Sequence, residues 1–263
     1  ITYMVGAEIP GLVVNVSRGG PGLGTIQPSQ SDYIQSTRGG GNGDYNNIVL
    51  APWSVQEMAD FVPLGFELAF KYRNPVIMLS DGVIGQMMER VVLPPYRPRR
   101  TDEEIKSQCP WAATGCTRGR KPNTFSSLDL DAHVMEQRNE VLQAKFRSMQ
   151  ENEVRVDEHF TEDADYLIVA FGSTARIALQ AIMELREKRM KIGLLRPITL
   201  WPFPTERIAQ LSAKVKGILD VEANAGQMLF DVQYAVAGRC PVAFSGHMGG
   251  VVHAPEEIVN TCM

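Results

Sequence analysis

The fold class of this chain is decided by Val13-Val14-Asn15-Val16-Ser17-Arg18-Gly19-Gly20-Pro21-Gly22-Leu23-Gly24. An apolar, β-branched run ends in an arginine, and the next six residues include four glycines and a proline, which predicts a buried strand that opens into a loop. Ligands of open α/β sheets bind at this carboxyl end of the strands. The glycines leave the backbone open to a ligand, and Arg18 offers a planar set of donors that suits a carboxylate or a phosphate.

Two interpretations of Arg18 follow from this pattern. The arginine grips the carboxylate of a small anionic substrate, or it only ends a strand in a surface salt bridge, and composition and spacing do not separate the two. The glycines match neither common phosphate-binding fingerprint. The phosphate loop needs Gly-Lys-Ser/Thr, and the dinucleotide pattern needs a third glycine where Gln27 stands.

Length and composition indicate an ordinary globular protein. The chain has 263 residues, 44% hydrophobic and 21% charged, which is enough for a sizeable core and predicts two domains. A net charge of -4 argues against nucleic acid as the main partner. No apolar run approaches the ~20 residues that span a bilayer. Residues 1–5 resemble no secretion signal, so we expect a cytoplasmic protein without a membrane segment.

The cysteines and histidines do not suggest a metal centre. The cysteines form no Cys-x-x-Cys pair and have no histidines at zinc spacing, so we expect free thiols and no iron–sulfur cluster held wholly by this chain. His247 and His253 stand apart from other candidate ligands in the sequence, which does not favour a metal role. The cysteines are Cys109, Cys116, Cys240 and Cys262.

The first half of the chain predicts one βαβ unit beside the opening strand. Residues 48–51 and 75–79 are apolar strand candidates, and Ser54-Val55-Gln56-Glu57 is a capping box for a helix that runs to about Tyr72. Because such crossovers join parallel neighbours, we expect Arg18 and Asp81 at the same edge of one sheet. Asp81 either contacts the substrate or closes the strand in an Asx-turn.

A second α/β rhythm begins near residue 165, after an irregular stretch at 89–121 and a polar helix at 131–150. Strands are predicted at 166–171, 192–195, 217–221 and 242–244, and helices at 174–188, 205–214, 227–236 and 255–261. They predict a parallel sheet covered by helices. In the loop expected at 196–204, Trp201 and Phe203 either anchor an interface or simply pack in the core.

Several of these motifs together resemble one known family, the alpha subunits of the 2-oxoacid:ferredoxin oxidoreductases. The resemblance covers essentially the whole chain, and Gly22-Leu23-Gly24 with Ser29-Gln30-Ser31-Asp32-Tyr33 is most similar to the branched-chain (2-oxoisovalerate) type. The motifs are Arg18-Gly19-Gly20-Pro21-Gly22-Leu23-Gly24, Gln30-Ser31-Asp32-Tyr33, Gly41-Asn42-Gly43-Asp44, Leu50-Ala51-Pro52, Ser54-Val55-Gln56-Glu57, Pro75-Val76, Ser80-Asp81-Gly82 and Arg196-Pro197-Ile198-Thr199-Leu200-Trp201-Pro202-Phe203-Pro204.

The resemblance implies an α/β fold in three segments. Residues 1–125 would form a partial thiamine-pyrimidine-type domain, 126–160 a linker helix, and 161–263 a transketolase C-terminal-like domain. It also implies an activity: oxidative decarboxylation of a 2-oxoacid with coenzyme A to acyl-CoA, carbon dioxide and reduced ferredoxin.

The cofactors and partners that the resemblance implies lie largely on other chains. Thiamine diphosphate and magnesium would be shared with a beta subunit, and 4Fe-4S clusters would sit on partner subunits and not on this chain. Further partners would be gamma subunits, ferredoxin-like delta subunits and ferredoxin itself.

Carried over to this sequence, the family's arginine that meets the substrate carboxylate matches Arg18, which is therefore the expected catalytic residue. We expect the substrate site to include Arg18, Gly19, Gly20, Asp32 and Asp81. The family's cofactor-site threonine and glutamate lie upstream of this arginine loop, so we expect the amino-terminal part of the subunit to be absent and this chain alone to be inactive. The run Gly246-His247-Met248-Gly249-Gly250 departs from the family pattern, in which Arg-Thr stands between the glycines.

Two other functions remain open from the sequence. The same pair of domains occurs in the beta subunit of lipoamide-linked 2-oxoacid dehydrogenases, which differ in their electron acceptor. A non-catalytic docking module would use the glycine loop only to bind a partner. The sequence does not decide which 2-oxoacid is used, because apolar pockets discriminate by only ~1–3 kcal/mol per methylene.

Overall fold

The apolar run before Arg18 forms strand β1 (Gly11–Ser17) in a computed structural model that describes residues 1–115 and 121–263. The strand is confirmed but the prediction that it is buried was wrong, because β1 lies at the edge of its sheet and Val14 and Val16 are each 48% exposed. β1 pairs in parallel with β3 (Pro75–Asp81), and Ser17 lies opposite Asp81. β2 (Ile48–Leu50) pairs in parallel with the other side of β3. The carboxyl ends of these three strands therefore share one edge of the sheet, and the sequence-based placement of Arg18 and Asp81 is confirmed.

The helix predicted after Ser54 packs on this sheet. Helix α3 (Val55–Tyr72) begins where the Ser54 hydroxyl accepts a hydrogen bond from the Glu57 amide at 3.1 Å. Its buried face contacts β1 and β3. A Cβ at Gly65 would lie 2.7 Å from a methyl of Leu12, so glycine allows the helix to approach β1 closely.

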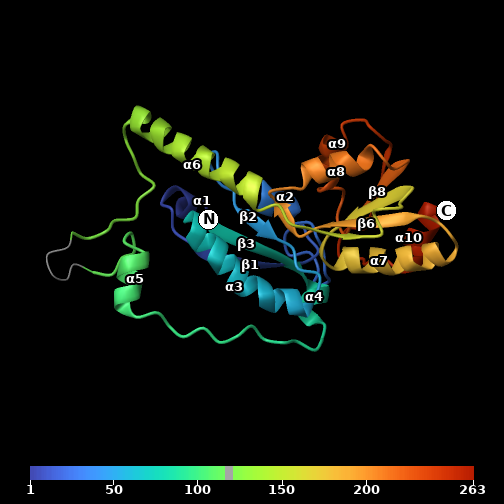
Figure 1. Cartoon of the computed structure of the whole chain (residues 1–263), viewed down its shortest axis with the longest axis horizontal. Coiled ribbons are helices and arrows are strands. Elements are labelled where there is room, and N and C mark those ends of the chain that lie inside the picture. Colours follow the sequence, from blue (N-terminus) through green and yellow to red (C-terminus); the bar gives the residue numbers. More distant parts are fainter. Residues whose placement is uncertain (116–120) are drawn as a thin grey trace.

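The second sheet has the order β4-β6-β5-β8-β9. All four predicted strands are confirmed and run in parallel, and α7 and α10 cover one face while α8 and α9 cover the other (Figure 1). The bounds are β5 Tyr166–Ala170, α7 Gly172–Glu187, β6 Ile192–Pro197, α8 Thr205–Ser212, β8 Gly217–Glu222, α9 Leu229–Val236, β9 Val242–Gly246 and α10 Pro255–Cys262.

Two short strands depart from the sequence-based picture. β4 (Val156–His159), inside the predicted linker segment, is an antiparallel edge strand beside β6. β7 (Thr199–Trp201), predicted as loop, pairs antiparallel with β2 and completes the first sheet in the order β1-β3-β2-β7. The loop prediction was wrong here because three residues between prolines carry no strand period; their partner is distant in sequence. The division into three segments stays a prediction. In the structure β7, from the third segment, joins the first sheet, and β4, from the linker segment, joins the second sheet.

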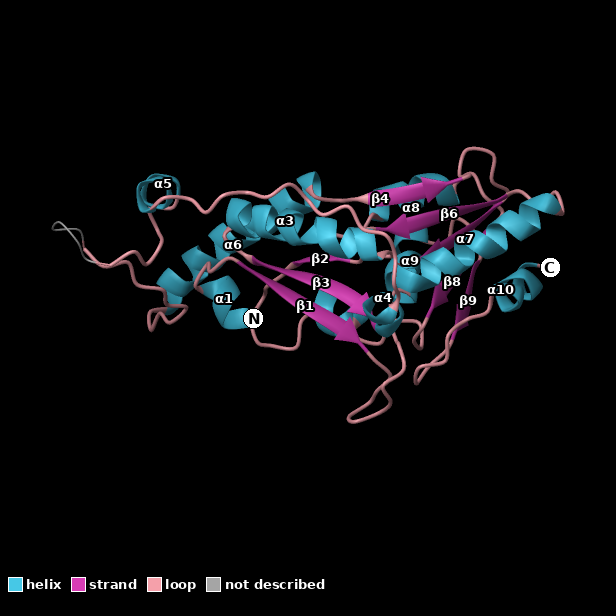
Figure 2. Cartoon of the chain, turned by 90° about the horizontal axis from the view of Figure 1, so that it is seen from below, coloured by secondary structure: helices cyan, strands magenta, loops and turns pink. Residues whose placement is uncertain are grey.

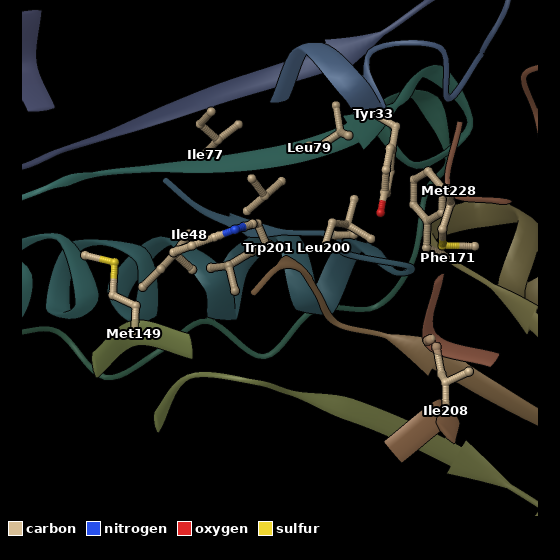
Figure 3. Packing of buried hydrophobic residues seen from close by; sticks show 14 of the residues in the cluster. Tyr33, Ile48, Ile77, Leu79, Met149, Phe171, Leu200, Trp201, Ile208 and Met228 are labelled. Atoms are coloured by element: carbon tan, nitrogen blue, oxygen red, sulfur yellow. The ribbon is translucent and has the colours of Figure 1, made fainter. Parts of the chain in front are cut away.

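One of two hydrophobic clusters among the described residues runs across both sheets, and the other lies between the second sheet, α7 and α10. Trp201 is 8% exposed and packs edge-on against Phe146, with ring centroids 6.3 Å apart, and Figure 3 shows it among residues of both halves. Trp201 therefore packs in the hydrophobic core at the place where the two sheets meet, so both interpretations of this residue, an interface anchor and core packing, apply. The labelled members of the cluster are Tyr33, Ile48, Ile77, Leu79, Met149, Phe171, Leu200, Trp201, Ile208 and Met228.

The remaining helices lie at the periphery. The polar helix predicted at 131–150 is confirmed as α6 (Ala132–Asn152), and α5 (Asp102–Gln108) lies on the irregular excursion that reaches away from the sheets (Figure 1). The short helices are α1 (Thr2–Gly6), α2 (Tyr33–Thr37) and α4 (Gly82–Gln86). Within residues 1–115 and 121–263, no helix combines the length and apolar character needed to cross a membrane.

Candidate active site at the ends of the parallel strands

The glycine-rich segment after β1 folds back on itself. The Gly19 amide donates to the carbonyl oxygen of Gln27 at 2.9 Å, and the Thr25 amide donates to the carbonyl oxygen of Gly19 at 2.8 Å. Gly24 has a φ of +49°, and a Cβ there would overlap the carbonyl of Gly19. The loop therefore closes only because a residue without a side chain stands at this position.

Arg18 lies at the base of this loop and is exposed. Its Nη1 donates to the carbonyl oxygens of Leu23 and Thr25, the latter at 3.2 Å, and its Nη2 donates to that of Gly22 at 3.4 Å. A guanidinium has five N–H donors, so Nε–H and one Nη2–H remain without a partner among the described residues. The surface salt bridge that was the alternative interpretation of Arg18 is not formed within this part of the chain.

A cleft of about 570 Å³ opens beside Arg18, a volume within the range of small-molecule sites. Residues that follow β1, β8 and β9 build its walls, and Figure 2 shows the loop after β1 leaving its sheet next to the loops of the second sheet. The lining residues are Arg18, Gly19, Gly20, Pro21, Gly22, Ser29, Ser31, Asp32, Asn224, Ala225, Gln227, Met248 and Gly249.

Backbone contact joins the two sides of the cleft. A Cβ at Gly19 would lie 2.6 Å from the carbonyl of Gly249, and a Cβ at Gly250 would overlap the Gln27 side chain. The two glycine loops are thus packed against each other, and the cleft is a junction of both halves of the molecule.

Asp32 lines the cleft together with Arg18, Gly19 and Gly20, so four of the five predicted site residues come together. It is half-buried at the start of α2, and its Oδ2 accepts a hydrogen bond from the Asn15 side-chain amide at 3.0 Å. Asn15 lies on β1, so the strand holds this carboxylate in place.

Asp81, the fifth predicted residue, does not line the cleft. It is 3% exposed, and its Oδ1 accepts from the amides of Val83 and Ile84, at 2.9 and 3.2 Å, as the N-cap of α4. Its Oδ2 accepts from the Ser173 hydroxyl at 2.6 Å. This geometry favours the turn-closing interpretation of Asp81 and adds a link to α7 that the sequence did not predict.

Two family models match almost the whole chain. The model described as "Pyruvate flavodoxin/ferredoxin oxidoreductase, thiamine diP-bdg" matches residues 1–157, and "Pyruvate:ferredoxin oxidoreductase core domain II" matches residues 164–258. Subunit VorB of the ketoisovalerate oxidoreductase of Methanothermobacter marburgensis is 46% identical over 95% of this chain and 69% of its own length. The chain belongs to the 2-oxoacid:ferredoxin oxidoreductase subunits.

Other relatives are named for 2-oxoglutarate. The 2-oxoglutarate synthase subunit KorA of the same organism is 32% identical over all of this chain and 76% of its own length. A solved 2-oxoglutarate:ferredoxin oxidoreductase from Magnetococcus marinus, with 2-oxoglutarate, coenzyme A and succinyl-CoA bound, is 25% identical with a TM-score of 0.77. That match covers 99% of this chain, which spans about half the length of the solved protein. VorB and KorA are both named as subunits, which supports a hetero-oligomeric enzyme.

Gln30 forms hydrogen bonds between the two halves of this oxidoreductase subunit, the parts of the chain that carry the first and the second sheet. Buried at 2% exposure, its side chain donates to the carbonyl of Phe171 at 2.7 Å and accepts from the Thr174 hydroxyl at 2.9 Å. It also accepts from the amide of Ala223 at 3.0 Å. The partners lie more than 140 residues away in sequence, and no local pattern around Gln30 predicts them.

A buried carboxyl pair supports the far wall of the cleft. Glu222 accepts hydrogen bonds from the amides of Met228 and Leu229 and from the side chain of Asn224, which lines the cleft. Asp220, two residues before Glu222 on β8, is fully buried, and neither of its carboxylate oxygens has a hydrogen-bond partner among the described residues. Burial, with the neighbouring Glu222 as a second cause, raises the pKa of Asp220 well above its usual value.

His247 and His253, which the sequence places away from other candidate metal ligands, lie next to each other in this subunit. The rings of His247 and His253 are 4.5 Å apart, and His247 Nε2 lies 3.1 Å from Glu257 Oε2. Burial, and then the nearby His247, lowers the pKa of His253 to about 4. Even so, the described residues include no group of three or more His, Cys, Asp or Glu side chains placed to hold a metal ion.

The cysteines lie away from the cleft. Cys109, Cys240 and Cys262 are free thiols, as predicted, and Cys116 lies outside the described residues. Burial raises the pKa of Cys240 and of Cys262, which disfavours their reactive thiolate form.

Proposed function

We propose that this chain is the alpha-type subunit of a 2-oxoacid:ferredoxin oxidoreductase in which Arg18 binds the carboxylate of the 2-oxoacid. The observation that carries the proposal is the position of Arg18 at the carboxyl end of β1, in the wall of the 570 Å³ cleft, with two N–H donors unused. The unused donors suit a carboxylate, and the charge attracts anionic substrates to the cleft.

The proposed reaction is the oxidative decarboxylation of a 2-oxoacid with coenzyme A. The bond between the carboxylate carbon and the 2-oxo carbon breaks and releases carbon dioxide, and a thioester bond to coenzyme A forms. Two electrons leave the acyl group one at a time and reduce two ferredoxins, and the thiol proton is released. Thiamine diphosphate, when bound, supplies the electron sink for the carbanion. The branched-chain acid 2-oxoisovalerate is the proposed substrate, since VorB is a ketoisovalerate oxidoreductase subunit.

The residues of this chain fit the substrate side of such a site. At Gly20 a Cβ would meet nothing closer than 3.9 Å, so the backbone leaves room there for a flat ring, and Arg18 provides a positive charge in the same cleft. We assign the diphosphate and Mg²⁺ to a beta subunit and the 4Fe-4S clusters to the beta, gamma or ferredoxin-like delta partners. Arg18 then acts by holding the substrate so that its 2-oxo carbon faces the cofactor.

The test is the pair of substitutions Arg18→Ala and Arg18→Lys in the assembled oxidoreductase. We expect kcat/KM for 2-oxoisovalerate to fall about 100-fold for Arg18→Ala, because a charge-assisted pair to the carboxylate is lost. Arg18→Lys keeps the charge but not the planar fork, so its loss is smaller. Arg147→Ala, an exposed arginine on α6, is the matched control and leaves kcat/KM unchanged. Equal kcat/KM for Arg18→Ala and the control, with every 2-oxoacid tested, refutes the proposal.

A further inference from the structure

The side chains that line the cleft differ in charge and polarity. Among the residues that the structure describes, its lining includes one cation, Arg18, one carboxylate, Asp32, and one long apolar side chain, Met248. A 2-oxoacid with a single carboxylate uses the cation completely. A dicarboxylic 2-oxoacid brings a second negative charge, which Asp32 repels and for which the lining holds no second cation.

Met248 lines the same cleft as Arg18, next to a point where the backbone is closely packed. It directly precedes Gly249, whose carbonyl contacts the Gly19 backbone on the Arg18 side of the cleft. Its side chain is 66% exposed and forms part of the cleft wall. Methionine is unbranched and adapts its shape, so it can cover the methyl groups of a branched aliphatic chain and remove them from water.

The side chain of Asp32 lies in the wall of the cleft without a cation beside it. Its one side-chain hydrogen bond comes from the neutral amide of Asn15, and no ion pair neutralises it among the described residues. A second carboxylate in this cleft therefore meets an uncompensated negative charge, and like charges brought together in a partly desolvated site repel strongly.

The side-chain amides of Asn224 and Gln227, in the loop that follows β8, already form hydrogen bonds within the protein. The amide of Asn224 donates to the Gln30 carbonyl and to Glu222, and its oxygen accepts from the amides of Gly226 and Gln227. The Gln227 side chain donates to the carbonyl of Ser31 and accepts from the amide of Ile34. The Asn224 amide therefore has no N–H left for a second carboxylate, and the Gln227 amide keeps only one.

We infer that Met248 and Asp32 are the residues of this subunit that select an aliphatic monocarboxylic 2-oxoacid over a dicarboxylic one. Met248 binds the aliphatic chain, and Asp32 repels a second carboxylate. The inference rests on the proposed function, because it takes the carboxylate of the substrate to lie on Arg18.

The test compares 2-oxoisovalerate with 2-oxoglutarate in the assembled oxidoreductase. We expect the wild type to favour 2-oxoisovalerate by at least tenfold in kcat/KM. Met248→Lys adds the missing second cation and shifts the ratio at least tenfold toward 2-oxoglutarate. Asp32→Asn removes the repulsion and shifts the ratio in the same direction, mostly through KM for 2-oxoglutarate. Met183→Lys, which adds the same charge at an exposed methionine of α7, is the matched control and leaves the ratio unchanged.

Binding provides a second readout that does not depend on turnover. Calorimetric titration of the complex with each 2-oxoacid, without coenzyme A, should show the same reversal of preference in Kd for Met248→Lys. The inference is overturned if the wild type prefers 2-oxoglutarate, or if Met248→Lys and Asp32→Asn leave both ratios as in the Met183→Lys control. That failure is distinct from failure of the proposed function, in which the Arg18 variants retain wild-type kcat/KM for every 2-oxoacid.

Discussion

Arg196 and Glu57 form a doubly hydrogen-bonded ion pair between the two halves of the molecule, with Nη1–Oε2 and Nη2–Oε1 both at 2.7 Å. Arg196 lies on β6 of the second sheet and is 1% exposed, while Glu57 belongs to α3 on the first sheet. The guanidinium also stacks 4.1 Å from the ring of Trp53. A pair so placed couples the positions of the sheets, and hence of the two sides of the cleft.

Breaking this pair should destabilise the protein strongly. Glu57→Gln leaves the charge of Arg196 buried without its main partner, and we expect the free energy of unfolding to fall by about 3 kcal/mol. Urea unfolding at neutral pH measures the change. The matched control is Arg97→Ala, which removes an exposed pair with Glu67 and should cost less than about 1 kcal/mol. Equal losses in the two variants would contradict the coupling role.

The two interpretations of Asp81 predict opposite results for Asp81→Asn. Asparagine caps a helix as well as aspartate, and its amide can donate to the Ser173 hydroxyl but cannot accept from the Ser173 amide as Oδ2 does at 3.3 Å, so we expect kcat/KM to stay near wild type and stability to fall by no more than about 1 kcal/mol. Asp81→Ala leaves buried donors unpaired and should cost about 2 kcal/mol of unfolding free energy. A large loss of kcat/KM in Asp81→Asn with unchanged stability would instead support direct substrate contact.

The loop closure at Gly24 can be tested against its neighbour Gly22. Both have positive φ, but a Cβ at Gly24 overlaps the Gly19 carbonyl while one at Gly22 meets nothing within 4 Å. Gly22→Ala should therefore cost only the backbone strain, about 1 kcal/mol. Gly24→Ala should open the loop that holds Arg18 and lower kcat/KM at least tenfold more than Gly22→Ala. The structure of the loop is misassigned if the two variants behave alike.

Asp220 should make the protein less stable as the pH rises. Because its pKa is higher in the folded than in the unfolded state, the folded protein retains a proton that the unfolded chain releases above pH ~4. Stability is then lost with rising pH, at up to about 1.4 kcal/mol per pH unit, until the folded-state pKa is passed. We expect Asp220→Asn to be more stable than wild type, by a margin that grows as the pH rises above ~4. A margin independent of pH would show that Asp220 is ionised in the folded protein.

His253 should have the opposite effect in acid. Its pKa is about 4 when folded and ~6.5 when unfolded, so stability is lost as the pH falls from ~6.5 toward 4. His253→Gln does not titrate, and we expect its loss of unfolding free energy between pH 7 and pH 5 to be about 1–2 kcal/mol smaller than that of wild type. His133→Gln, an exposed histidine on α6, is the control and should follow the wild type. If His253→Gln does so too, burial does not hold His253 neutral.

The sequence predicted features that depend on neighbouring residues, but not contacts between residues far apart along the chain. The capping box at Ser54 correctly predicted where α3 begins, since the Ser54 hydroxyl does accept from the Glu57 amide. The same pattern could not show that the Glu57 carboxylate binds Arg196, which lies 139 residues later. Likewise β7 could not be predicted, because a strand of three residues is defined by its partner β2 and not by its own periodicity.

By itself, the sequence determined that this is an α/β protein of two sheets, that Arg18 and Asp81 end neighbouring parallel strands, and to which family the chain belongs. These properties follow from hydrophobic period, turn residues and motif order, which are written along the chain. Only the tertiary structure decided that Asp81 is a buried cap and that Asp32 and Met248 join Arg18 in one cleft. The physical reason is that backbone packing of Gly19 on Gly249 and the buried bonds of Gln30 bring together segments about 200 residues apart.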